Sequence, residues 1–296
     1  MRRMSAGSAT PRPADRLQVL AAALLFSTGG AAVKACALTS WQVASFRSGI
    51  AAVAMLLLLP AARKGWSLRV LPVALAYAAT MILFVSGNKL TTAANTIFLQ
   101  STAPLYIMLL SPLLLGERIR RRDLAYMGAL AAGMLLFFVG EHQPVRTAPD
   151  PDLGNLVAAG AGLTWAATIL GLRWLGRDDS SADQSVTAVV FGNLLACLVA
   201  LPFALPVTSA RPVDWALVGF LGVFQIGLAY AFLTRGVRRV PALEVSLLLL
   251  LEPVLNPVWA FVVHGETPGH WAALGGAIVI VATAVNTLAR GPSGQR

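Results

Sequence analysis

A glutamate in the middle of a long apolar run has the clearest chemical potential in this sequence. Glu252 follows Arg239 by 13 residues, which on a helix corresponds to roughly 20 Å. The hydrocarbon core of a membrane is about 30 Å thick, so this carboxylate is expected near its middle, facing protein or water. Asn256 and Trp259 share its helical face at i+4 and i+7. Two interpretations stay open: the carboxylate binds a substrate ammonium or a proton, or it is hydrogen-bonded to backbone that nearby prolines have freed.

Three further charged side chains lie in apolar runs or at their edges. Arg47 is six residues past Trp41, roughly 9 Å below the membrane surface, and either contacts a substrate carboxylate or reaches back to water. Lys34, at the end of the first run, offers the same choice between a substrate contact and an interfacial anchor. Glu244 is only five residues from Arg239, so pairing with a neighbouring arginine is favoured over a substrate contact.

Polar and aromatic side chains form stripes along several runs, such as the i, i+4, i+7, i+11 series that starts at Tyr77. A stripe that mixes amides, hydroxyls and aromatic rings either lines a watery cavity or holds helices together, and we favour the lining. The expected cavity residues are Tyr77, Met81, Phe84, Asn88, Asn95, Thr102, Tyr106, Trp165, Gln225, Tyr230, Glu252 and Asn256.

Other kinds of chemistry have no motif in the sequence. It contains no G-x-x-x-x-G-K-[ST], H-E-x-x-H or G-x-S-x-G pattern. Its two cysteines are too few for a disulfide framework or a cysteine metal cluster. We therefore expect no metal site and no cofactor. An intramembrane enzyme is disfavoured because no pair of nucleophile and base is visible, and an intramembrane Glu252 would be unusual in a non-transporting scaffold.

The composition requires that membrane-spanning helices carry these residues. Of 296 residues, 57% are hydrophobic and only 12% are charged, whereas soluble domains carry about 25% charged residues. This excludes a soluble enzyme, a disordered chain and a nucleic-acid module, despite the net charge of +10. The apolar runs lack the alternation of barrel strands, so they are expected to be helices. Ten are predicted: Leu17–Ala35, Trp41–Leu59, Val70–Asn88, Thr91–Leu115, Leu124–Gly140, Leu153–Leu172, Gln184–Leu205, Val213–Thr234, Val240–Val263 and Trp271–Leu288.

The distribution of lysine and arginine predicts the orientation. With the N-terminus in the cytoplasm, the cytoplasmic side carries 18 of these residues and the other side only 3, namely Lys89, Arg146 and Arg211. Such a bias indicates that both termini are cytoplasmic in an inner membrane. The basic charge is thus explained by topology, with contact to anionic lipid at most, and no nucleic-acid partner is expected.

The chain divides near residue 150 into two halves of five predicted helices. The fourth helices of the halves align with an offset of 149 residues, and in both a proline precedes a Gly-Glu pair by 12 and 13 positions. Because five is odd, the halves must insert in opposite directions, which is typical of transporters. The sequence therefore predicts an all-α integral membrane protein with ten transmembrane helices, arranged as two inverted five-helix repeats around a central cavity. The aligned positions are Ala93 and Ala242, Leu99 and Leu248, Pro104 and Pro253, and 116–117 and 265–266.

The expected domains follow from this division. They are a disordered cytoplasmic N-terminus at 1–15, repeat 1 at 16–140, a periplasmic linker at 141–152, repeat 2 at 153–290 and a cytoplasmic tail at 291–296. Glu117 and Glu266 precede the next helices and are expected to stabilise their positive N-termini. Prolines interrupt the fourth helix of each half and are expected to act as hinges; they are Pro104, Pro112, Pro253 and Pro257.

These features resemble the EamA-type drug/metabolite transporter superfamily. Each half has that family's Pro…Gly-Glu pattern, and the Leu251-Glu252-Pro253-Val254 run is similar to its second-repeat motif. Ser45-Phe46-Arg47 resembles its first-repeat arginine, and Thr164-Trp165 its small-residue/Trp step. The first helix departs from the pattern, with Phe26-Ser27-Thr28-Gly29 where a Trp-Gly step is common. The resemblance covers residues 17–290, is strongest to the amino-acid exporters, including those named for aromatic substrates, and implies export through alternating access.

We therefore expect an inner-membrane exporter of amino acids with a broad neutral and aromatic range. Facilitated and gradient-driven transport both fit the residues. A drug or other small-metabolite transporter of the same fold is the alternative, and an intramembrane enzyme is the less favoured one. The expected partners are the small-molecule substrate and membrane lipid, and the chain is expected to be a monomer or a weak homodimer.

Overall fold

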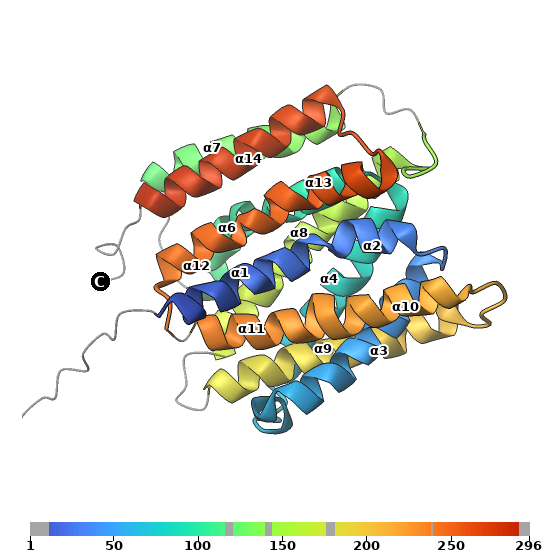
Figure 1. Ribbon diagram of the computed structural model, residues 1–296. Helices are drawn as coiled ribbons and strands as arrows, with labels where there is room; N and C mark the ends of the chain where they lie inside the picture. Colours follow the sequence, from blue (N-terminus) through green and yellow to red (C-terminus); the bar gives the residue numbers. More distant parts are fainter. Residues whose placement is uncertain (1–11, 116–120, 140–143, 176–180, 238, 290–296) are drawn as a thin grey trace, which may run out of the picture.

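The computed structural model describes residues 12–115, 121–139, 144–175, 181–237 and 239–289, and these fold into helices with no β-strand among them. The helices run side by side, with α7 and α14 along one edge and α3 and α9 along the opposite edge (Figure 1). The α-helices are α1 (Pro13–Ser27), α2 (Gly29–Ala35), α3 (Ser40–Leu58), α4 (Val70–Leu90), α5 (Ala93–Gln100), α6 (Ala103–Leu115), α7 (Arg121–Leu135), α8 (Pro151–Leu175), α9 (Ser181–Ala204), α10 (Pro212–Phe220), α11 (Ala229–Gly236), α12 (Ala242–Leu249), α13 (Leu251–His264) and α14 (His270–Ala289). Two 3₁₀ segments, η1 (Pro60–Arg63) and η2 (Leu136–Phe138), and one π-helix, η3 (Leu221–Leu228), complete the set.

These elements form ten apolar crossings, as the sequence predicts. Within the described residues, nine segments are long and apolar enough to span a membrane, and the shorter Asp123–Phe138 completes two sets of five. Several crossings join two or three elements end to end, such as α1 with α2 and α10 with η3 and α11. Many large apolar side chains face outward, and Leu113 is 83% exposed, as expected for a surface in contact with lipid. The chain is thus a multi-pass, all-α membrane protein.

Two crossings begin earlier than hydropathy indicates. The first helix starts at Pro13, within the segment expected to be disordered, because a proline suits the first helical position and the Asp15 carboxylate accepts a hydrogen bond from the Arg12 backbone N–H at 3.2 Å. The sixth crossing starts at Pro151, inside the expected linker, where the Asp150 carboxylate accepts from the Leu153 N–H at 3.2 Å. Other predicted features lie outside the described residues: the chain ends at 1–11 and 290–296, linker residues 141–143, and Gly116-Glu117.

The fourth crossing of each half is broken at matching positions. One helix ends at Gln100 and the next begins at Ala103, while in the second half one ends at Leu249 and the next begins at Leu251. Pro104 and Pro253 follow these breaks, each four residues after the last residue of the preceding helix. A proline lacks the N–H that would bond to the carbonyl four residues earlier, so neither helix can continue unbroken. The two breaks therefore have the same local cause and the same 149-residue offset.

The two halves interleave. Helix α4 packs against α8 and α9, and α3 packs against α9, so repeat-1 helices lie between repeat-2 helices. Gly192 permits one of these contacts, since a Cβ there would lie 2.7 Å from a Tyr77 ring carbon and 2.9 Å from the Ala74 carbonyl. This close approach of α9 and α4 helps to fix the Tyr77 ring.

Candidate functional site

A cavity of about 510 Å³ lies between the two halves. Its lining comes from both repeats and extends to Leu172, Leu233 and Ser246, which are each within about one turn of a helix end. Those helix ends lie at the end of the bundle where α1 begins and α14 finishes, which we term the terminal end; the other is the far end (Figure 1). The cavity thus extends from residues nearer the far end, such as Arg47 and Phe84, to the terminal end.

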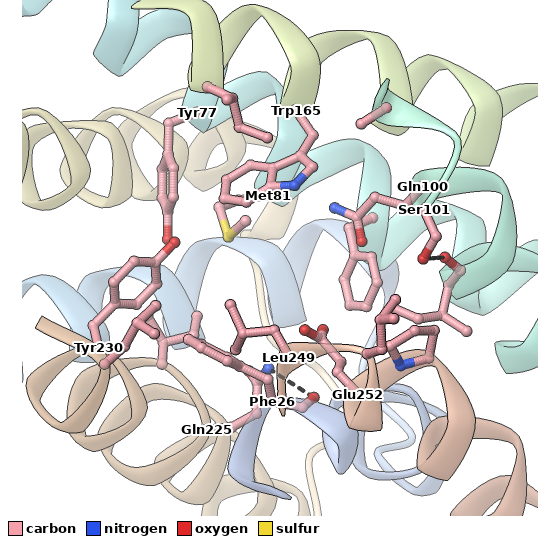
Figure 2. A pocket seen from close by; sticks show the side chains of 18 of the residues that line it. Phe26, Tyr77, Met81, Gln100, Ser101, Trp165, Gln225, Tyr230, Leu249 and Glu252 are labelled. Atoms are coloured by element: carbon pink, nitrogen blue, oxygen red, sulfur yellow. Dashed lines mark hydrogen bonds between the residues drawn. The ribbon is translucent and has the colours of Figure 1, made fainter. Parts of the chain in front are cut away.

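Several residues singled out in the sequence line this cavity. They come from helices of both repeats, and the labelled side chains point into one common space (Figure 2). These residues are Arg47, Tyr77, Met81, Phe84, Pro104, Trp165, Gln225, Tyr230, Glu252 and Pro253.

Arg47 is a buried cation in the cavity wall. It is 1% exposed, and its Nη2 donates to the Met81 carbonyl at 3.3 Å and contacts the Met81 sulfur at 3.7 Å. The guanidinium carbon lies 5.7 Å from the centre of the Phe84 ring, a cation–π arrangement. Its Nε has no hydrogen-bond partner within the described part of the chain. None of these contacts supplies a negative charge.

Glu252 is the carboxylate of the same cavity. It belongs to the first turn of α13, where the helix dipole favours an acidic side chain. In Figure 2 its carboxylate points into the space below Trp165 and Met81. Among the residues that the structure describes, Arg47 and Glu252 are the charged groups of the lining, and they form no ion pair with each other.

Aromatic rings form the wall toward α11. Tyr230 contacts Phe26 edge-on, with ring centres 5.3 Å apart, and its ring centre lies 6.3 Å from that of Tyr77. Asn193 donates from its side-chain nitrogen to the Tyr77 hydroxyl at 3.3 Å, which orients that ring. Trp165 packs in the same cluster. This wall is broad and apolar, with hydroxyl groups at its edge, as suits an amphipathic ligand.

Polar contacts close the far end. Lys34 Nζ lies 3.1 Å from Glu266 Oε2, with both side chains 3% exposed, and also donates to the Thr91 carbonyl at 2.8 Å and to that of Thr147. The other oxygen of Glu266 accepts from the Ala93 N–H at 2.5 Å. Glu266 therefore caps the N-terminus of α5 in the opposite repeat, whereas its sequence position suggested the next helix of its own repeat. This closure joins both halves.

Three asparagines, Asn88, Asn95 and Asn155, are buried near the far end. Asn155 accepts from Thr91 at 2.8 Å and from Asn95 at 3.0 Å, and donates to the Phe137 carbonyl at 2.7 Å. Asn88 donates to the Phe84 carbonyl at 2.9 Å. Asn88 and Asn95 were expected in the cavity, but both are buried outside its lining: Asn95 bonds to Asn155 of another helix, whereas Asn88 bonds within α4.

Other expected cavity residues also lie elsewhere. Thr102 donates to the Leu99 carbonyl at 2.6 Å, and the Tyr106 hydroxyl contacts the Met134 sulfur at 3.4 Å. Asn256 is fully buried against α2, where a Cβ on Gly30 would lie 2.6 Å from its oxygen. Thr102 and Tyr106 would share a helical face with Asn95 on an unbroken helix, but the break after Gln100 changes the phase between them.

Glu244 has a structural partner, and two of the four prolines expected to act as hinges lie inside continuous helices. Glu244 pairs with Arg16 at 2.6 Å near the terminal end, outside the cavity lining, so the expected arginine pairing exists. Helices α6 and α13 continue through Pro112 and Pro257, so the breaks lie before Pro104 and Pro253.

The sequence did not single out several lining residues. Figure 2 shows Phe26, Gln100, Ser101 and Leu249 in the cavity wall. Gln100, Ser101 and Leu249 flank the two helix breaks, so the repeated prolines were an available signal.

Gln225 is presented by the π-helix η3, an element frequent at functional sites, and its side-chain nitrogen donates to the Phe26 carbonyl at 3.5 Å. Among the described residues, no group of three His, Cys, Asp or Glu side chains could hold a metal.

The chain matches the EamA-like transporter family over residues 16–139 and again over residues 152–288. The chain belongs to this family. EamA-like proteins are transporters, so the cavity belongs to a membrane transporter and not to an enzyme. The two matched segments correspond to two copies of the family's domain.

Named relatives extend this similarity. The pseudopaline exporter CntI of Pseudomonas aeruginosa is 26% identical over 90% of this chain and 93% of its own length. The aromatic amino acid exporter YddG of Ancylobacter novellus is 29% identical over 69% of this chain and 70% of its own. The uncharacterized transporter YyaM of Bacillus subtilis is 24% identical, and the match spans 65% of its length. A solved crystal structure with 23% identity superposes with a TM-score of 0.62 over 95% of this chain and 99% of that one, which shows likeness of fold alone.

Proposed function

We propose that this EamA-like transporter exports amino acids of broad neutral and aromatic range by alternating access. The observation that carries the proposal is the cavity itself, which combines a buried guanidinium, a carboxylate and an aromatic wall. An α-amino acid has a matching carboxylate and ammonium on one carbon, and an aromatic side chain fits the apolar wall. The similarity to an aromatic amino acid exporter supports the same substrate class.

The arrangement of the cavity supports the direction of transport. The inner membrane is the proposed location, with both termini cytoplasmic, as the distribution of lysine and arginine favours. The terminal end would then face the cytoplasm, and the cavity, whose lining extends to that end, would take up its substrate there. The far end, closed by Lys34 and Glu266, would face the periplasm. Opening that end while the terminal end closes would release the substrate outside.

Flux measurements test the proposal directly. Purified protein in liposomes loaded with labelled phenylalanine, methionine or threonine is expected to give saturable, protein-dependent release that unlabelled substrates compete for. Liposomes with an Arg47→Gln/Glu252→Gln double variant provide the matched control and should show strongly reduced flux. If no amino acid in the panel moves faster than in empty liposomes, the proposed substrate class is wrong.

A second candidate substrate comes from the relative that the chain matches along nearly its whole length. CntI is named as a pseudopaline exporter, and its match covers 90% of this chain. Pseudopaline therefore belongs in the same panel, together with organic cations for the drug-transporter alternative. Release of pseudopaline or of an organic cation without release of any amino acid would assign the cavity to that other class.

A further inference from the structure

The cavity contains two opposite charges that the protein leaves without ionic partners. A buried charge is strongly unfavourable unless another charge or several hydrogen bonds compensate it. Other buried charged groups obey this rule here: Asp15 pairs with Arg239 at 3.2 Å, and Asp214 with Arg211 at 2.9 Å. Arg47 does not, because its described contacts are one carbonyl, one sulfur and one aromatic ring.

The unused hydrogen-bonding capacity of Arg47 indicates what it would bind. A guanidinium has five N–H donors in a planar fork that matches a carboxylate with two parallel hydrogen bonds. Here Nη2 makes both described hydrogen-bond contacts, and the buried Nε makes none. The guanidinium carbon lies 5.7 Å from the centre of the Phe84 ring, and Nη2 contacts the Met81 sulfur. These contacts hold the guanidinium in place. A carboxylate in the cavity would therefore meet a pre-oriented partner.

Among the described residues, Glu252 lacks a positively charged partner, just as Arg47 lacks a negatively charged one. It extends from α13 on the second repeat, whereas Arg47 comes from α3 on the first, so the two charges belong to different halves of the molecule. Its carboxylate accepts no hydrogen bond from another described side chain and points into the cavity (Figure 2). An ammonium group, with three N–H donors and a compact positive charge, is the ligand chemistry that satisfies it.

We propose that the cavity binds a zwitterion in one fixed orientation, with its carboxylate at Arg47 and its ammonium at Glu252. This inference rests on the proposed function and adds a polarity to the site. A substrate of this kind satisfies both charges at once and links the two repeats through itself. An anion alone or a cation alone satisfies one charge and leaves the other unpaired. The site therefore selects for the presence of both groups, and the aromatic wall sets the side-chain preference.

Three ligands of nearly equal size test this orientation. Phenylalanine has both charges, phenylalaninamide lacks the carboxylate, and 3-phenylpropionate lacks the ammonium. Binding to the purified wild-type protein in nanodiscs is measured by calorimetry for each. Charged hydrogen bonds of this kind contribute enough that phenylalanine should bind about 10- to 100-fold more tightly than either analogue.

Variants then assign each charge to one end of the ligand. Arg47→Gln should weaken phenylalanine about 10- to 100-fold and phenylalaninamide by less than about threefold, because the amide has no carboxylate to lose. Glu252→Gln should weaken phenylalanine similarly but 3-phenylpropionate by less than about threefold. Arg47→Lys keeps the charge and should restore part of the preference for phenylalanine over the amide. Melting temperatures of all variants, with Arg63→Gln as an exposed arginine control, check that each protein is folded.

The outcomes separate the two proposals. The crossed pattern of losses supports the orientation. If folded variants weaken all three ligands equally, or if the losses cross in the opposite sense, the orientation is overturned while the amino-acid function stands. If the wild-type protein binds none of the three ligands and no other amino acid, the proposed function and the orientation both fail.

Discussion

Lys34 and Glu266 form a buried ion pair that joins the two repeats at the far end of the bundle. Their charged atoms lie 3.1 Å apart, and Glu266 also caps α5 while Lys34 also binds the carbonyls of Thr91 and Thr147. One pair thus connects α2, α5, the loop before α8 and the end of α13. Any movement that opened the far end would have to separate these groups, so the pair stabilises the conformation seen here.

Removing one partner is expected to cost more than removing both. Lys34→Met leaves the buried Glu266 carboxylate without its cation, and such single changes typically cost about 3–5 kcal/mol. The Lys34→Met/Glu266→Gln double variant leaves no unpaired charge, so a cycle of melting temperatures should give a coupling of about 1–3 kcal/mol. Additive losses would show that the two side chains do not stabilise each other.

The Lys34→Met variant should also open the far end to thiol-alkylating reagents. Cys36 is 2% exposed there, and burial raises the pKa of its thiol, so it should react slowly in the wild-type protein. In a Cys197→Ser background, Lys34→Met is expected to increase the rate of Cys36 alkylation at least about tenfold, because about 1.4 kcal/mol, a fraction of the expected loss, already gives a factor of ten in the open population. An unchanged rate would mean that other contacts keep the far end closed.

Hydropathy alone predicted the ten crossings because each is a long apolar run, and the differences in their bounds lie at helix ends, where local capping decides. The Pro13 and Pro151 starts are examples, since Asp15 and Asp150 extend the helices into segments that look polar. Of the four prolines expected to interrupt the fourth helices, Pro104 and Pro253, which share the 149-residue offset, follow breaks, because a proline blocks the same hydrogen bond in each half. The helices continue through Pro112 and Pro257. These features depend on neighbours in sequence and so can be read from it.

The site was less predictable because its residues come from distant parts of the chain. Tyr77, Met81 and Phe84 of the first stripe line the cavity, but Asn88 on the same helix does not. Asn95 and Thr102, on either side of a helix break, also lie outside it. Partner choice is also a long-range property. Nothing local distinguishes Lys34, which has a carboxylate partner from the other repeat, from Arg47, which has none.

Trp165 is expected to determine the preference for large side chains. It lines the cavity from α8, next to Met81 and Tyr77. Trp165→Ala removes an apolar surface that an aromatic substrate would contact, so KM for phenylalanine should rise about 10- to 100-fold. KM for threonine should change by less than about threefold, because its side chain has little apolar area to bury. Trp174→Ala on the same helix, at a tryptophan 41% exposed and outside the lining, is the control. Equal changes for both substrates would remove Trp165 from side-chain selection.

Proton coupling, if present, should depend on Glu252. The carboxylate can carry either a proton or a substrate ammonium, so binding of one would release the other. Liposomes with an acidic interior are then expected to accumulate phenylalanine, because protons leaving the lumen exchange for substrate entering it. Glu252→Gln at saturating phenylalanine should retain downhill exchange but lose this accumulation. Accumulation that persists in the variant would place the coupling elsewhere, and its absence in the wild-type protein would indicate uniport.

The helix breaks should influence the rate of transport more than the affinity for the substrate. Pro253 lies in the first turn of α13, where backbone N–H groups have no intrahelical partner, so it costs α13 little but prevents α12 from continuing. Pro253→Ala supplies the missing N–H to the Leu249 carbonyl and favours one continuous helix. Because conformational steps set many kcat values, we expect kcat to fall about tenfold with a smaller change in KM, and the melting temperature to rise by about 2–4 °C. Pro257→Ala, in the unbroken part of α13, should affect kcat less. Flux assays across a substrate series measure both constants, and equal effects of the two variants would contradict a hinge at Leu250.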